Sequence, residues 1–308
     1  MNKLLASIAA LAALTTPIAA FALNETLPAA AAEAEGEAPA RFSVEVVGEG
    51  ERDAILIPGL LSPRSVWDGQ IETLTKAGYR VHLVQVNGFG GTEAGANAQG
   101  PVLPVLLKDL AHYIEANELK DVHVVGHSMG GFTALNLALD RPELVDEIMI
   151  VDSLPFFSVL MGMQTPEAAK GQAEQMRSMM VAQAAMDLPA PDCDTPAMQA
   201  QGMAKSPEAQ CKVDLYTATA DARVGGQLMY EIMTTDLRPR LSELKVPVTM
   251  LYPVDPPMVS AEMAKNLYPV QYAAAPDVSF VPVEGARHFI MLDQPEAMNT
   301  ALAKFAAE

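Results

Sequence analysis

The stretch VVGHSMGG, residues 124–131, decides the fold prediction because it places one serine between an apolar run and a helix-forming run. Ser128 follows DVHVVG, residues 121–126, which has the short, continuous apolar character of a buried strand. The segment MGGFTALNLALDR, residues 129–141, has apolar residues at helical spacing and ends before Pro142. A strand that turns into a helix this tightly strains the serine backbone and exposes its hydroxyl. This context indicates a reactive serine rather than an ordinary loop residue.

The glycines of this stretch have a physical reason to be there. Gly126 and Gly130 flank Ser128 in a G-x-S-x-G pattern, and their missing Cβ atoms allow the strand and the helix to pass closely. The serine oxygen would then lie beside a helix N-terminus, which favours a developing negative charge. The pattern therefore predicts a nucleophile.

Strands and helices alternate through most of the chain, which implies parallel βαβ units and a doubly wound α/β sheet. The interval 155–236 is the exception, because it has no clear strand and contains ten of the 18 methionines. We therefore expect a core formed by residues 41–154 plus 237–308 and a helical cap formed by residues 155–236. The predicted strands are 42–47, 54–59, 79–86, 121–126, 145–153, 246–254 and 278–285, and the predicted helices are 66–78, 101–117, 129–141, 259–268 and 294–308.

The hexapeptide GHSMGG, with the strand order around it, resembles the α/β-hydrolase fold and its nucleophile elbow over residues 42–308. The resemblance implies a mostly parallel sheet with a cap and a catalytic triad in the chain order serine, acid, histidine. A serine nucleophile excludes the relatives in which an aspartate attacks alkyl halides or epoxides. The expected reaction is hydrolysis of an ester, thioester or amide through an acyl-enzyme.

Five histidines are candidates for the base that a serine hydroxyl needs. His82 and His123 fall in predicted strands and His112 in a predicted helix, so we interpret all three as structural or exposed. His127 adjoins the nucleophile, and its side chain must point away from the cleft, so it is expected to support the turn. His288 lies in a loop before the last helix, in a segment that resembles the family's catalytic histidine segment. It is the predicted base.

The acid that orients this histidine has two candidates. Asp255 follows the strand 246–254, where the family most often has its acid, and is the preferred residue. Residues 253–257 depart from the family's usual Gly-x-x-Asp pattern. Asp152, at the end of the preceding core strand, is the alternative, unless its carboxylate only binds nearby loop amides. Asp293 is expected to begin a helix.

Two backbone amides are expected to form the oxyanion hole. The first is that of Met129, the residue after the nucleophile. The second, by family analogy, is that of Leu60 in the loop PGLLSP, residues 58–63. Trp67, in the next helix, is interpreted as a packing residue.

Charge and composition exclude several partners. The formal net charge is −18, and lysines and arginines are not clustered, which argues against nucleic acid. No Cys/His/Asp cluster has metal-ligand spacing, and the glycine-rich loop 87–101 lacks the G-K-[ST] end of a phosphate-binding motif. We therefore predict neither a metal nor an organic cofactor.

The amino terminus predicts export. Lys3, the apolar run 4–14 and the A-x-A site ending at Ala22 are typical of a signal peptide, residues 1–22, cleaved after Ala22. An uncleaved anchor is the alternative. Residues 23–40 have the composition of a disordered linker. The mature protein is expected in the periplasm or outside the cell, without stable membrane insertion.

The two cysteines, Cys193 and Cys211, fit one disulfide in an exported protein, and two free buried thiols are the alternative.

The methionine-rich apolar cap favours a small hydrophobic ester as substrate. An amino- or imino-peptidase is a second candidate, for which Asp192, Asp194 and Asp214 are available to bind a free amine. A cofactor-free haloperoxidase and a binding protein without catalysis are the remaining alternatives. The oligomeric state is not predicted.

Overall fold

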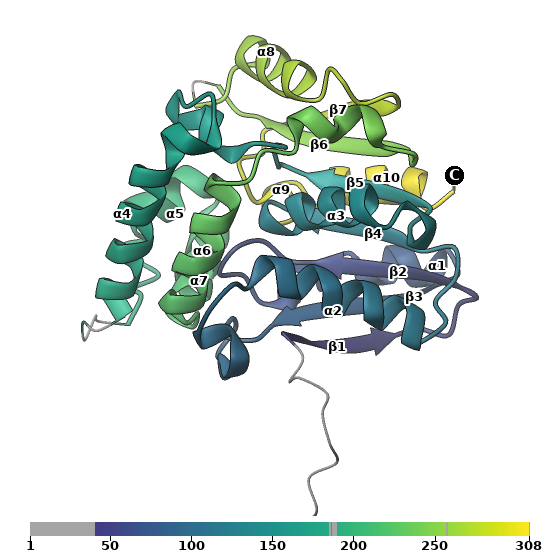
Figure 1. Ribbon diagram of the computed structural model, residues 1–308, viewed down its shortest axis with the longest axis horizontal. Coiled ribbons are helices and arrows are strands. Elements are labelled where there is room, and N and C mark those ends of the chain that lie inside the picture. The colour runs from purple at the N-terminus through teal and green to yellow at the C-terminus, as the bar shows by residue number, and fades with distance from the viewer. Residues whose placement is uncertain (1–40, 185, 187–189, 257, 308) are drawn as a thin grey trace, which may run out of the picture. The chain divides into compact units, whose positions relative to one another are not determined.

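One seven-stranded sheet organises the described part of the chain, with strand order β1-β3-β2-β4-β5-β6-β7 (Figure 1). The edge strand β1 pairs antiparallel with β3, and every other neighbouring pair is parallel. This confirms the predicted α/β-hydrolase fold. The strands are β1 (Phe42–Val47), β2 (Arg52–Ile57), β3 (Tyr79–Val86), β4 (His123–His127), β5 (Glu147–Val151), β6 (Val248–Val254) and β7 (Val278–Glu284).

The computed structural model describes residues 41–184, 186, 190–256 and 258–307. The described residues fall within one compact unit, Pro39–Glu308. The predicted signal peptide 1–22 and linker 23–40 lie outside the described residues. Among the described helices, none is long and apolar enough to span a membrane.

Helices cover both faces of the sheet because each buries one apolar stripe against it. In α2, Leu103, Leu106, Leu110 and Ile114 recur every three or four residues and are all buried. One face carries an apolar cluster with α2, α3 and α8, and the other carries a cluster with α1, α9 and α10. These helices are α1 (Ile71–Lys76), α2 (Leu103–Ala116), α3 (Met129–Asp140), α8 (Ala261–Gln271), α9 (Ile290–Asp293) and α10 (Pro295–Phe305).

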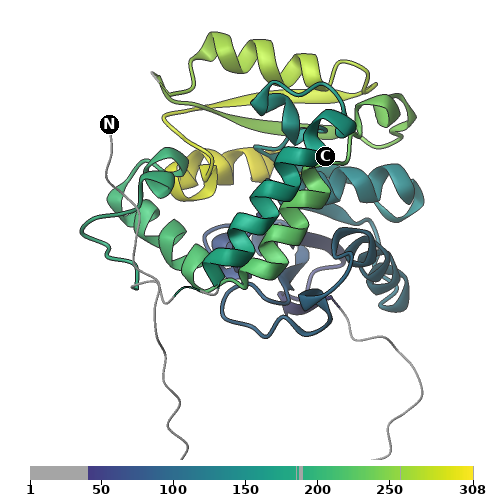
Figure 2. The same cartoon turned by 60° about the vertical axis from the view of Figure 1, so that its left-hand side comes forward.

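In the described sequence, four α-helices and the short 3₁₀ helix η4 form the cap, and a second 3₁₀ helix, η5 (Arg238–Glu243), follows them before β6. The cap helices gather beyond the carboxyl ends of the parallel strands, where α4 and α7 run side by side (Figures 1 and 2). Gly226 permits this approach, because a Cβ atom there would lie 3.1 Å from the Arg177 carbonyl oxygen. The cap elements are η4 (Phe157–Met161), α4 (Pro166–Ala184), α5 (Met198–Met203), α6 (Pro207–Ala218) and α7 (Ala222–Met233).

A disulfide joins Cys193 to Cys211 within the cap, and their Cα atoms are 4.8 Å apart. It closes a loop with a sequence separation of 18. On the chain-entropy model, closing a loop of this length lowers the entropy of the unfolded chain and so stabilises the folded state by roughly 3 kcal/mol.

Two predicted helices differ from the structure in extent. The helix expected over 66–78 is divided into a 3₁₀ turn, η1 (Arg64–Trp67), and α1. The helix expected over 259–268 continues through Pro269 to Gln271. It continues because Tyr272 is buried against the core and its amide donates to the Tyr268 carbonyl. Tyr268 in the helix and Tyr272 at its C-cap, four residues apart, therefore lie on the same side of α8.

Candidate active site

Ser128 occupies the turn between β4 and α3 with φ 53° and ψ −115°. Its amide donates to the Val151 carbonyl oxygen at 2.9 Å, and its carbonyl accepts from the Phe132 amide at 3.0 Å. A non-glycine residue with positive φ in this region is sterically disfavoured. The structure therefore shows the strained turn that the sequence predicted.

Gly126 and Gly130 permit the turn because no Cβ atom fits at either position. A Cβ at Gly126 would lie 2.2 Å from the Gly130 carbonyl oxygen. A Cβ at Gly130 would lie 2.1 Å from the carbonyl oxygen of Ile57 in the neighbouring strand. The obstructing atoms belong to the backbone, so side-chain rearrangement cannot relieve the overlap.

Asp152, the residue after β5, contacts the predicted base. Its Oδ2 lies 2.7 Å from the Nδ1 atom of His288. The hydroxyl of Tyr268 donates to its other oxygen, Oδ1. Because His127 pairs with Val151 in the sheet, Ser128 and Asp152 leave two adjacent strands at the same edge. The serine, the carboxylate and the loop that carries the histidine therefore meet at this edge of the sheet.

Asp255 does not contact His288, and the preference for it over Asp152 is corrected. Its Oδ1 lies 2.8 Å from Lys205 Nζ, and its Oδ2 lies 2.8 Å from Arg287 Nε. Its backbone also pairs with Val259 in both directions. The physical reason is the length of β6. This strand continues for three residues after Leu251, which pairs with Val151 at the end of β5, so Asp255 follows its strand farther along than Asp152 does.

Sequence reasoning missed Tyr268, the second partner of Asp152. Burial raises the pKa of its phenol, and the negative charge of Asp152 raises it further. The phenol therefore keeps its proton and donates a hydrogen bond to the carboxylate. The available sequence signal for this partner was the four-residue spacing of Tyr268 and Tyr272, which places both side chains on one side of α8. The Tyr272 hydroxyl donates to the carbonyl oxygen of Ser153, the residue after Asp152, at 3.0 Å.

The two predicted oxyanion donors flank the nucleophile. Met129 is buried at the first turn of α3. Leu60 follows Gly59, where a Cβ would lie 3.4 Å from the Ser128 Cβ, so this loop runs beside the serine. Leu61 has φ 63° and contacts the cap, because its Cδ2 is 2.4 Å from a Cβ placed at Gly225 of α7.

His127 is fully buried and supports the loop of the base. Its Nε2 lies 3.0 Å from the His288 carbonyl oxygen, which can only accept, so Nε2 carries the proton. Its ring centroid is 4.6 Å from that of His288. Burial lowers the pKa of His127 well below its ordinary value, and the nearby His288 lowers it further. The ring is therefore neutral, as a supporting role for the turn requires.

We expect the free energy of unfolding to fall as the pH drops below about 6.5. Burial lowers the pKa values of both His127 and His82 in the folded chain, so only the unfolded chain takes up their protons in this range. A histidine that takes up its proton only in the unfolded chain costs at most roughly 1.4 kcal/mol per pH unit, and His127, whose pKa is lowered furthest, should approach this limit. Urea unfolding at pH 7.5 and 5.5 measures the slope. His127→Gln, which retains a donor, should reduce it, and an unchanged slope would contradict this assignment.

The remaining predicted residues have structural partners. His82 lies 3.0 Å from the buried Asp53 carboxylate and 2.8 Å from the Tyr113 hydroxyl. His123 lies 3.0 Å from the Tyr79 hydroxyl. Trp67 is fully buried, as expected for a packing residue.

The acidic residues considered for amine recognition lie in the cap, Asp192 and Asp194 before α5 and Asp214 within α6. Asp192 accepts from the Thr195 hydroxyl at 2.7 Å and from the Asp194 amide at 3.0 Å. Asp214 accepts from the Ala197 amide at 2.7 Å. Within the described ranges, no group of three or more His, Cys, Asp or Glu residues is arranged to hold a metal ion.

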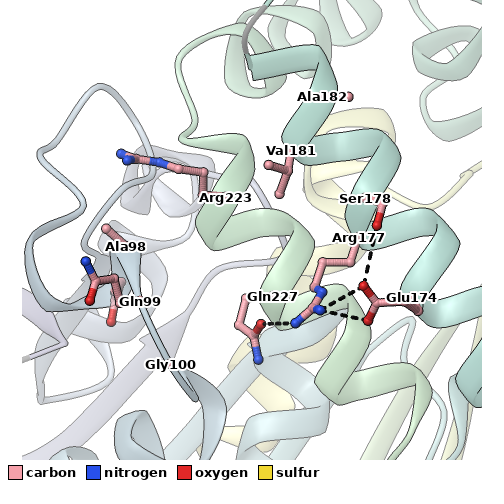
Figure 3. Close-up of a pocket in the computed structure, with 11 residues that line it drawn as sticks. Ala98, Gln99, Gly100, Glu174, Arg177, Ser178, Val181, Ala182, Arg223 and Gln227 are labelled. Carbon is pink, nitrogen blue, oxygen red and sulfur yellow. Dashed lines mark hydrogen bonds and ion pairs between the residues drawn. The ribbon is translucent and has the colours of Figure 1, made fainter.

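A cavity of about 520 Å³ lies between α4, α7 and the loop 97–100 (Figure 3). Arg177, which faces it, lies 2.7 Å from Glu174 and 3.0 Å from Gln227, so its charge and donors are engaged (Figure 3). The lining residues do not include Ser128, and the cavity is separate from the serine site.

Comparison with known proteins agrees with the fold. The profile of the α/β-hydrolase fold matches residues 55–295. A pimeloyl-[acyl-carrier protein] methyl ester esterase from Vibrio atlanticus is 28% identical over 230 residues, which cover 72% of this chain and 83% of that protein. Two other relatives, from Variovorax paradoxus and Aeromonas hydrophila, are 32% and 35% identical, but the chain spans only 41% and 42% of their lengths.

Solved structures show the same architecture. A bromoperoxidase from Bacillus anthracis superposes with a TM-score of 0.69 at 19% identity, covering 87% of this chain and 95% of that one. An enol-lactonase from Burkholderia xenovorans superposes with a TM-score of 0.67 at 18% identity, covering 87% and 96%. At these identities the likeness establishes the fold alone.

Proposed function

Because the chain belongs to the α/β-hydrolase fold family, we propose that it is a serine hydrolase that cleaves a carboxylic ester through an acyl-enzyme. The observation that carries the proposal is the 2.7 Å contact between His288 Nδ1 and Asp152 at the sheet edge where Ser128 lies, partly buried, on its strained turn. A nucleophile, a base and an orienting carboxylate are the groups that acyl transfer requires.

In the proposed mechanism, Ser128 Oγ attacks the ester carbonyl while His288 Nε2 takes its proton. Asp152 accepts the Nδ1–H of His288, which holds the productive tautomer and stabilises the imidazolium. The backbone amides of Met129 and Leu60 receive the oxyanion, each contributing about 3 kcal/mol in the transition state. His288 then returns the proton to the leaving alcohol, and water releases the acid by the same route in reverse.

The surroundings of the elbow support a hydrophobic substrate. Leu60, Leu61, Phe157 and Val159 are partly buried apolar residues on the oxyanion loop and the first cap turn. The relative from Vibrio atlanticus is named as a methyl ester esterase, which favours an ester over an amide. Two of the carboxylates offered for amine binding, Asp192 and Asp214, accept hydrogen bonds from within the cap, which weakens the peptidase alternative.

A fluorophosphonate probe tests the reaction type, because it phosphonylates only a serine activated by its base. We expect stoichiometric labelling that peptide mapping locates at Ser128, and no labelling of Ser128→Ala. A p-nitrophenyl ester series should then show turnover. Equal labelling of wild type and Ser128→Ala would overturn the serine mechanism, and turnover of amino-acid anilides alone would overturn the ester.

The proposal includes export. The A-x-A site ending at Ala22 supports it, and so does the Cys193–Cys211 disulfide, since disulfides persist in oxidising compartments. The amino terminus of the protein recovered from the producing cell, expected at Leu23, checks this part.

A further inference from the structure

Asp255 bridges the cap to the loop that carries His288. One of its oxygens lies 2.8 Å from Lys205 Nζ in the cap, and the other lies 2.8 Å from Nε of Arg287, the neighbour of His288 in the chain. The Asp255 side chain is only 7% exposed. A nearly buried carboxylate with both oxygens engaged by cations fixes those two cations relative to each other.

Asp293 joins the same two residues through their backbones. Its Oδ1 accepts from the Lys205 amide at 2.8 Å, and its Oδ2 accepts from the Arg287 amide at 2.9 Å. Lys205 and Arg287 are therefore each held by both carboxylates. We refer to Asp255, Asp293, Lys205 and Arg287 as the cap latch.

Further contacts extend the latch on both sides of His288. The Arg287 guanidinium donates to the carbonyls of Gln201 and Ala204 in the cap. The amide of Phe289 donates to the Met203 carbonyl at 3.1 Å. Both neighbours of His288 in the chain are therefore bonded directly to the cap segment 201–204.

Apolar packing and the disulfide hold the cap segment 201–204 in place. Ala200 and Ala204 are fully buried in the same apolar cluster as Phe289. The Cys193–Cys211 disulfide closes the loop that contains the segment. The Gln210 side chain, next to Cys211, donates to the carbonyls of Ala204 and Lys205 at 3.1 Å each.

The charge balance explains why the latch is sensitive to one substitution. Hydrogen bonds from Lys205 and Arg287 lower the pKa of Asp255, so it is ionised at neutral pH. Removing one partner of a buried charged group leaves the others uncompensated, which is more disruptive than loss of an exposed pair.

We propose that Asp255 and Asp293 are positioning residues that hold His288 in register with Ser128 by fastening its loop to the docked cap. The inference rests on the proposed serine hydrolase function. On this basis, the carboxylate after β6 serves the reaction indirectly, while Asp152 contacts the base itself. A displaced cap segment 201–204 would release the residues on either side of His288, so chemistry would depend on the placement of this segment rather than of the whole cap.

The test compares kcat, KM and the rate of fluorophosphonate labelling in the full chain. Asp255→Asn should lower kcat and the labelling rate by about tenfold, with a smaller change in KM, because a small displacement of the base slows proton transfer. Lys205→Met, at the partly exposed end, should have a smaller effect in the same direction. The double variant should be no slower than Asp255→Asn alone, since both changes remove one interaction. Asp255→Glu should restore part of the rate.

Glu231→Gln provides the matched control. Glu231, on α7, is another buried carboxylate that joins the cap to the core, accepting from the Val102 and Leu103 amides at 3.0 and 2.7 Å. We expect it to lower the free energy of unfolding and leave kcat within about twofold of wild type.

The outcomes separate this inference from the proposed function. A wild-type protein that is not labelled at Ser128 overturns the function. Labelled wild type with an unchanged kcat in a destabilised Asp255→Asn overturns only the positioning role. Should Asp255→Asn not fold, Lys205→Met decides, and an unchanged kcat there rejects the latch.

Discussion

Replacing Asp152 with asparagine is expected to lower kcat for ester hydrolysis by about 10⁴-fold. Tyr268 donates to Oδ1, so the asparagine amide should keep its oxygen toward Tyr268 and turn its NH₂ toward His288. The histidine Nδ1 must then accept, and its proton moves to Nε2, where it cannot take the serine proton. Asparagine also tolerates the φ of 48° at this position, so the backbone should be retained.

Two further variants make the result interpretable. Adding Tyr268→Phe to Asp152→Asn removes the hydroxyl that orients the amide, so the amide can turn its oxygen to His288 and part of the lost kcat should return. Asp255→Asn should cost only about tenfold through the latch. A larger loss from Asp255→Asn than from Asp152→Asn would reverse the assignment of the acid that the geometry supports.

The sequence was sufficient for the sheet and the elbow because both are specified locally. Apolar strands that alternate with helices fix a parallel sheet, and the steric demand at Gly126 and Gly130 is visible in the G-x-S-x-G spacing. His288 was identified by its place before the last helix, and the structure brings it to Asp152.

The acid was not decided by sequence because the deciding facts are non-local. Asp152 and Asp255 both follow core strands, and nothing in the one-dimensional pattern shows that β6 extends three residues beyond the pairing with β5. The partners that occupy Asp255 come from the cap and from the residue beside His288, 50 positions before it and 32 after it. The four-residue spacing of Tyr268 and Tyr272 indicates that the two side chains share a side, but it cannot show that this side faces the Asp152 carboxylate from another strand.

Replacing Ser128 with glycine is expected to abolish turnover and to leave a more stable protein than Ser128→Ala. Either change removes the attacking oxygen, so kcat should fall by at least about 10⁴-fold. The two differ in the backbone, because alanine retains the disfavoured φ of 53° and ψ of −115° while glycine adopts it freely. Strain of this kind costs roughly 1–3 kcal/mol, and the extra freedom of glycine in the unfolded chain offsets about 0.5–1 kcal/mol of the gain.

The net difference of about 1 kcal/mol should appear as a Tm some 2–4 °C higher for Ser128→Gly than for Ser128→Ala. Comparing the two inactive variants with each other removes any contribution of the serine hydroxyl to stability. Equal melting temperatures, or a more stable alanine variant, would mean that the elbow stores no strain. A higher Tm for glycine would show that the fold sacrifices stability at Ser128 to expose the nucleophile, which the close approach at Gly126 and Gly130 makes possible.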